Sequence, residues 1–286
     1  MMNDRTTLGI GYATGCLEVP GARLYYETRG AGPLLLLIPG ANGDANGFPP
    51  LAGRLAADFT VVSYDRRGYT RSILDGVQDY AHRLETDADD ARRLIEHLAA
   101  EPATVFGTSS GAVIALQLLI DHPQAVRALV AFEPAAFRLL PDGEKWIAFE
   151  NEVYELYRRS GPAPARGLFV QRLFAEVDHP IMSRAPAPEH ATTVTANANY
   201  FFEREMRQYI AAELDMGKLL QRAQVVIPAM GLASADFPDG RAARALSLRL
   251  RRELLELPDG HVGYITSTEE FARRLVQRLK QEAGNG

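Results

Sequence analysis

The amino-acid sequence predicts an α/β fold, with a mostly parallel sheet covered by helices on both faces. Three observations support this. Short apolar runs end at glycine, proline or charged turns, as buried strands of a parallel sheet do. Amphipathic helical patterns alternate with these runs along the chain. One long stretch, from about 134 to 217, has helical and aromatic character and contains no strand pattern. Together they favour a layered sheet domain that carries a helical insertion.

Eight segments have the apolar, β-rich character expected of strands. They lie at 17–19, 23–28, 34–38, 60–64, 104–106, 128–132, 225–232 and 253–257. The helices are expected between the later strands. A helix at 86–100 places Ala88, Ala91, Leu94, Ile95 and Leu98 on one face, and the segment 111–122 is apolar nearly all round. A capping-box pattern at 267–270 precedes the apolar stripe of a final helix.

The helical stretch is expected to be an insertion in the sheet domain. We assign 1–135 and 217–286 to the core and 136–216 to a helical cap, which would form a lid over the edge of the sheet. Proline-rich breaks at 161–164 and 185–188 divide this segment into shorter helices. The alternative is that these helices merely lengthen the core.

Composition narrows the function classes. The chain has 286 residues, 47% hydrophobic residues and a formal net charge of −5 with both signs interspersed. No basic patch indicates a nucleic-acid or membrane partner. The lone Cys16 excludes an internal disulfide and a cysteine metal cluster. With no signal-peptide pattern and no run long enough to span a bilayer, we expect a soluble, cytoplasmic protein. Whether it forms a homo-oligomer is left open.

The pentapeptide at 107–111, Gly-Thr-Ser-Ser-Gly, is the strongest chemical signal. It matches G-x-S-x-G between a predicted strand and a predicted helix, which is the context that makes this motif informative. The middle residue, Ser109, would project from the tight turn as a nucleophile. The next residue, Ser110, would begin the helix, and its free backbone N–H could stabilise an oxyanion. The competing interpretation is a polar turn without chemistry.

A serine nucleophile needs an adjacent base. Of six histidines, His261 alone follows the last predicted strand and precedes the last helix, so it would open on the same sheet edge as Ser109. A carboxylate must then orient the imidazole. Asp236, after the strand at 225–232, is the first choice. Glu133, after the strand at 128–132, is the alternative, whereas Asp259 has the character of a turn residue.

With Ser109, Asp236 and His261 in this chain order, the sequence resembles the α/β-hydrolase fold family, in which the serine, the acid and the histidine follow one another in the same order. The resemblance implies an eight-stranded, mostly parallel sheet with helices on both faces and an inserted lid. It also implies that Ala41, in the Pro-Gly-Ala-Asn-Gly segment at 39–43, supplies a second oxyanion N–H. The turn at 65–72 is similar to the family's D-x-R-G-x-G-x-S turn, with Thr70 where glycine is common, and is expected to brace loops near the site.

The resemblance implies a serine hydrolase that cleaves an ester, lactone or amide bond of a small, mostly apolar molecule through an acyl-enzyme. It implies no organic cofactor and no metal. An alternative is carbon–carbon bond hydrolysis, or peracid formation in the manner of non-haem haloperoxidases, on the same scaffold. A further alternative is a non-catalytic small-molecule receptor with a vestigial triad.

Overall fold

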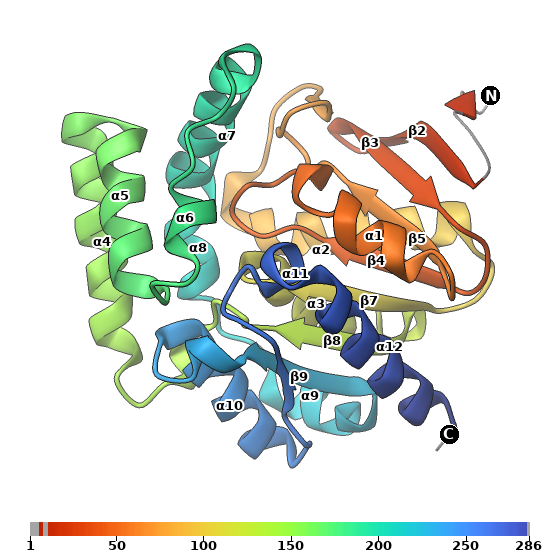
Figure 1. Cartoon of the computed structure of the whole chain (residues 1–286). Coiled ribbons are helices and arrows are strands. Elements are labelled where there is room, and N and C mark those ends of the chain that lie inside the picture. Colours follow the sequence, from red (N-terminus) through yellow and green to blue (C-terminus); the bar gives the residue numbers. More distant parts are fainter. Residues whose placement is uncertain (1–5, 8–10, 285–286) are drawn as a thin grey trace.

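The computed structural model describes residues 6–7 and 11–284, which build one twisted sheet with helices on both faces (Figure 1). The strands follow the order β1-β2-β3-β5-β4-β7-β8-β9-β10, and β6 pairs with β3. From β5 to β10 all neighbours on this path are parallel, whereas β1, β2 and β3 form an antiparallel edge that joins β5. The strands are β1 (Thr6–Thr7), β2 (Tyr12–Val19), β3 (Ala22–Arg29), β4 (Leu34–Ile38), β5 (Thr60–Tyr64), β6 (Ile73–Leu74), β7 (Ala103–Thr108), β8 (Val126–Phe132), β9 (Val226–Gly231) and β10 (Leu255–Leu257).

The α/β prediction is confirmed, and each of the eight predicted strands overlaps one observed strand. The expected number of strands was wrong, because the described part of the chain has ten. The two additional strands, β1 and β6, have two residues each. Segments this short leave no alternating pattern in a sequence, so only their pairing with β2 and β3 reveals them.

Helices α2, α3 and α10 pack on one face of the sheet, and α1 and α12 pack on the other. Strand β4 shows how one strand serves both faces: Leu36 and Ile38 belong to the first cluster, and Leu35 and Leu37 to the second. All are buried because successive strand residues point to opposite faces. The helices of the two layers are α1 (Pro49–Leu55), α2 (Arg83–Leu98), α3 (Ser110–Asp121), α10 (Pro238–Leu250) and α12 (Thr268–Gly284).

The chain between β8 and β9 contains helices and no strand among the described residues. Helices α4, α5, α6, α7 and α8 stand together to one side of the sheet (Figure 1). Four of them, α4, α5, α7 and α8, share a small apolar cluster in which Val153, Ala165, Phe201, Phe202 and Met206 are buried. These inserted helices are α4 (Gly143–Ser160), α5 (Pro162–Leu173), α6 (His179–Met182), α7 (Ala191–Arg204), α8 (Met206–Ile210) and α9 (Met216–Gln221).

Candidate active site

Ser109 lies at the sharp turn between β7 and α3, with φ +56° and ψ −125°. A non-glycine residue held in this region of φ/ψ space costs about 1–3 kcal/mol and persists where its surroundings enforce it. The chain segments around this turn pack very close to one another. A Cβ added to Gly111 would lie 2.3 Å from the carbonyl oxygen of Ile38, and one added to Gly40 would lie 2.9 Å from Cβ of Ser109. The small residues of the motif therefore allow the turn that presents the Ser109 side chain.

His261 lies in the loop between β10 and the short helix α11 (Gly263–Thr266), with its side chain buried. Its Nδ1 donates to Oε2 of Glu133 over 2.6 Å. The other carboxylate oxygen of Glu133 accepts the backbone N–H of Gly231 at 2.7 Å. This second bond fixes the plane of the carboxylate. Because the carboxylate can only accept, a neutral imidazole must carry its proton on Nδ1.

Asp236, the first-choice acid, does not lie at His261. It is exposed in the connection between β9 and α10, and its charge acts on Arg241. Among the described residues, Glu133 is the one that accepts the hydrogen bond of Nδ1, so the preference for Asp236 is corrected in favour of the alternative. The reason is local. After β9 the chain forms a 3₁₀ turn at Leu232–Ser234 that leaves Asp236 outside, and only the first turn of α10 comes back inward.

Two aspartates near His261 were missed at the sequence level. Asp239, in the first turn of α10, is buried with Oδ2 3.9 Å from Nδ1 of His261. Asp178 comes from the inserted segment, where its two oxygens accept the backbone N–H groups of His261 and Val262, each at 3.0 Å. The ring of Phe174 packs 4.4 Å from the imidazole. Asp178 follows no strand, so the pattern that identified the other candidates could not identify it.

The surrounding carboxylates control the protonation of His261. Burial would lower the pKa of the imidazole, but the hydrogen bond and charge of Glu133, with the charges of Asp239 and Asp178, outweigh it and raise the pKa to about 9. Burial, and then the charge of Glu133, raise the pKa of Asp239 to about 7, although His261 opposes this. Burial also raises the pKa of Asp178. The site is therefore acid-rich and favours an imidazolium.

Ser109 lines two cavities that share Ala41 and Phe169. The inner cavity, of about 20 Å³, is lined by Ser110, Glu150 and Asp239 together with apolar side chains. The outer cavity, of about 90 Å³, is lined by His261 and by Phe174. It shares Ala41, Arg166 and Met182 with a larger entrance cavity of about 720 Å³ bounded by the inserted helices. Ser109 and His261 thus face one cavity, and Ser109 also faces the space behind it.

The backbone N–H groups of Ala41 and Ser110 belong to residues that both line the inner cavity. Among the described residues, no hydrogen bond is donated by either N–H group. Ser110 is the first residue of α3, where the helix leaves its N–H without an internal acceptor and where the helix dipole is positive. Both predicted N–H donors therefore remain available at the position of Ser109.

Buried ion pairs brace the turn after β5 and tie it to the inserted helices. Arg66 donates to Glu205 at 2.8 Å, to Asp87 at 3.1 Å and to the carbonyl of Gly40 at 2.9 Å. Arg83 also pairs with Asp87 and with Glu205. Glu205 lies between α7 and α8, so this network joins the sheet domain to the insertion and holds the loop that carries Ala41.

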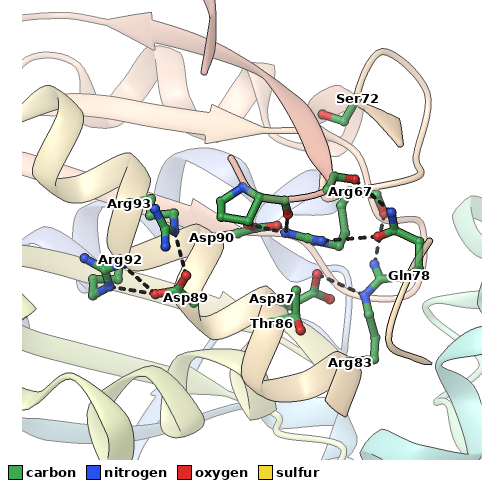
Figure 2. A network of polar contacts seen from close by, with 12 residues as sticks. Arg67, Ser72, Gln78, Arg83, Thr86, Asp87, Asp89, Asp90, Arg92 and Arg93 are labelled. Carbon is green, nitrogen blue, oxygen red and sulfur yellow. Dashed lines mark hydrogen bonds and ion pairs between the residues drawn. The ribbon is translucent and has the colours of Figure 1, made fainter. Parts of the chain in front are cut away.

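Figure 2 shows the adjoining part of the network on α2. Arg67 binds both oxygens of Asp90, at 2.6 and 2.7 Å, and reaches Gln78 at 3.3 Å. Arg83 lies beside Asp87 in the same view (Figure 2). The expectation that the turn at 65–72 braces nearby loops agrees with these contacts. Thr70, which replaces the common glycine, has φ +42° and donates its hydroxyl to Asp44 at 2.7 Å.

Two further findings concern all the described residues together. None of the helices in the described part is both long and apolar enough to cross a membrane. Within residues 6–7 and 11–284, no group of three or more His, Cys, Asp or Glu side chains is arranged to hold a metal ion.

Comparison with known proteins agrees with this architecture. A sequence family model described as the alpha/beta hydrolase fold matches residues 33–225. An uncharacterized hydrolase, YraK of Bacillus subtilis, is 36% identical over 274 residues, which is 94% of this chain and 96% of that protein. Among solved structures, a carboxylesterase of the thaumarchaeon Nitrososphaera gargenis has a TM-score of 0.70 at 21% identity, with 95% of this chain and 100% of that chain covered.

The enol-lactonase of Burkholderia xenovorans has a TM-score of 0.67 at 20% identity and covers 93% of this chain and 99% of its own. At these identities the structural matches establish the fold alone. The family model covers more than half of this chain, and the match to the Bacillus hydrolase extends over nearly all of it. The chain therefore belongs to the α/β hydrolase fold family.

Proposed function

We propose that this protein is a serine hydrolase that cleaves an ester, lactone or amide bond of a small, mostly apolar molecule. One observation carries the proposal: Ser109, held in a strained turn, and His261, held by Glu133, line the same cavity. The proposed catalytic residues are Ser109, His261 and Glu133, with Glu133 in the role first assigned to Asp236. The family membership supports hydrolysis, and the serine at the turn favours an ester intermediate.

In the proposed mechanism, His261 takes the proton of Ser109 through Nε2 as the hydroxyl attacks a carbonyl carbon. Glu133 accepts the Nδ1 proton, keeps the imidazole in the required tautomer and stabilises the imidazolium. His261 then protonates the leaving group, which departs from the acyl-enzyme. It finally activates a water molecule that releases the acid.

The oxyanion of the tetrahedral intermediate would be bound by the backbone N–H groups of Ala41 and Ser110. Removing one such donor typically costs about 3–4 kcal/mol of transition-state stabilisation. The inserted helices contribute Phe169 and Phe201 to the cavity walls, which supports a mostly apolar substrate.

A fluorophosphonate probe tests the proposal, because it labels only an activated serine. We expect labelling of the natural protein and none of Ser109→Ala. Ser160→Ala, at the exposed end of α4, is the matched control and should label normally. A screen of p-nitrophenyl esters, lactones and amides then identifies the bond. Absence of labelling in the natural protein, or equal labelling of Ser109→Ala, would exclude a serine hydrolase. Activity on a diketone but on none of the esters would favour carbon–carbon hydrolysis.

A further inference from the structure

The inner cavity behind Ser109 is lined by three residues that each carry an unsatisfied polar atom. Oε2 of Glu150, Oδ1 of Asp239 and Oγ of Ser110 are buried, and none of them has a hydrogen-bond partner among the described residues. Glu150 comes from the inserted helix α4, and Asp239 comes from α10. Buried polar atoms are rarely left without partners, because each costs about 1–3 kcal/mol. Three around one small space indicate a polar ligand.

The two carboxyl groups differ from an ordinary acidic cluster. Burial, and then the nearby Asp239, raise the pKa of Glu150 well above its usual value. The charge that acts on Glu150 is that of Asp239, no cation among the described residues pairs with it, and it is 1% exposed. Burial without a cation favours the neutral, protonated form of this carboxyl group. It can therefore donate an O–H to an acceptor as well as accept a hydrogen bond.

The two cavities can be assigned to the two parts of a substrate, its leaving group and its acyl part. His261 lines the outer cavity and is absent from the described lining of the inner one. The base that protonates a leaving group must lie beside it, so the leaving group belongs in the outer cavity. The acyl part of the substrate then extends past Ser109 into the inner cavity.

We propose that the inner cavity binds a single hydroxyl group on the acyl part of the substrate, close to the scissile carbonyl, and that Glu150 recognises it. This specificity role rests on the proposed function as a serine hydrolase. A volume of about 20 Å³ suits one water-sized polar group. The apolar side chains of Leu173, Met206 and Ile210 complete the walls and exclude a larger polar chain. A hydroxyl both donates and accepts, which matches a protonated carboxyl beside a second oxygen.

The test compares p-nitrophenyl esters whose acyl groups have the same shape. Propionate is paired with glycolate, and butyrate with 3-hydroxypropionate, with rates corrected for spontaneous hydrolysis. We expect kcat/KM to favour the hydroxylated member of at least one pair by tenfold or more. A site that binds a substrate hydroxyl discriminates against the analogue without it, because its own buried groups are then left unpaired.

Variants assign the effect to Glu150. Glu150→Leu should reduce the preference to less than about twofold, whereas Glu150→Gln, which keeps a donor, should retain it. Glu152→Leu, exposed on the same helix, is the matched control and should leave the preference unchanged. Fluorophosphonate labelling of Ser109 and thermal melting show whether each variant is folded.

The outcomes separate the two proposals. Lack of labelling in the natural protein defeats the serine hydrolase itself. Normal labelling with no hydroxyl preference in either pair overturns the inference and leaves a cavity that holds only water. A preference that survives in Glu150→Leu also overturns it. The glycine ester carries an ammonium group in place of the hydroxyl of glycolate, and stronger activity on it would show a cation site instead.

Discussion

Asp178, which lies between helices α5 and α6 of the insertion, holds the backbone of His261 from 83 residues away in the sequence. Its Oδ2 accepts the N–H of His261 and its Oδ1 accepts the N–H of Val262, both at 3.0 Å. The segment inserted between β8 and β9 thus contributes directly to the loop that carries the proposed base. A carboxylate that binds two successive N–H groups fixes the direction of that loop.

Asp178→Asn should weaken this attachment, because an amide can accept through only one of its two terminal atoms. We expect kcat/KM to fall by about tenfold or more, and the acid limb of the pH profile to move to lower pH because a charge that raises the pKa of His261 is lost. Glu176→Gln, exposed two residues earlier, is the control. A drop in melting temperature with an unmoved pH profile would indicate a merely structural role.

Glu133→Gln should reduce kcat/KM by about 10³–10⁴-fold, the effect expected when the carboxylate that orients a catalytic histidine is neutralised. Asp236→Asn should remain within about twofold of the natural protein, because Asp236 is exposed and lies away from His261. Steady-state kinetics on the best ester of the screen would measure both. The reverse result would restore Asp236 as the acid.

The pH dependence of kcat/KM should follow the ionisation of His261. The base must be neutral to accept the proton of Ser109, and the pKa of His261 is raised to about 9. Activity on an uncharged ester should therefore rise with pH and level off only above about pH 9. In Glu133→Gln the group that raises this pKa is lost, so the limb should move to lower pH. A profile already flat at pH 7 in the natural protein would contradict this assignment.

Glu205→Gln should destabilise the fold, since it removes a buried carboxylate shared by Arg66 and Arg83. Removing one partner of a buried ion pair typically lowers the unfolding free energy by about 3–5 kcal/mol. Glu203→Gln is the matched control two residues away, because its pair with Arg158 is more exposed and should contribute less than about 1 kcal/mol. Urea unfolding would measure the difference. If Glu205→Gln lowered the unfolding free energy as little as Glu203→Gln, the buried network would contribute little to stability.

Strands and the turn at Ser109 could be predicted because their signals are local. An apolar run such as 34–38 is buried along its whole length in a parallel sheet. The turn at Ser109 is recognised from five consecutive residues, although the structure shows that Gly111 also needs its small size to pass the carbonyl oxygen of Ile38. His261 followed from topology, since the carboxyl ends of parallel strands meet at one edge. Nothing in these steps depended on the inserted helices.

The choice between carboxylates depended on tertiary packing. Asp236 and Glu133 both follow strands, and the sequence alone does not show that a 3₁₀ turn carries Asp236 outward. Glu133 has φ +47°, an unusual value for a non-glycine residue, and that constraint is visible only in the structure. Asp178 and Glu150 reach the site from the insertion, whose fold over the sheet no local pattern determines.

The arginine network also bears on how a substrate could arrive. Arg66 and Arg83 are almost completely buried, with anionic partners on both the sheet domain and the insertion. A rigid-body movement of the inserted helices away from the sheet would separate both guanidinium groups from Glu205, at a cost in free energy for each. These buried ion pairs therefore oppose a hinged opening of the insertion. Substrates would then be selected by size where the entrance cavity joins the outer cavity, at Arg166, Phe169 and Met182, before they reach Ser109.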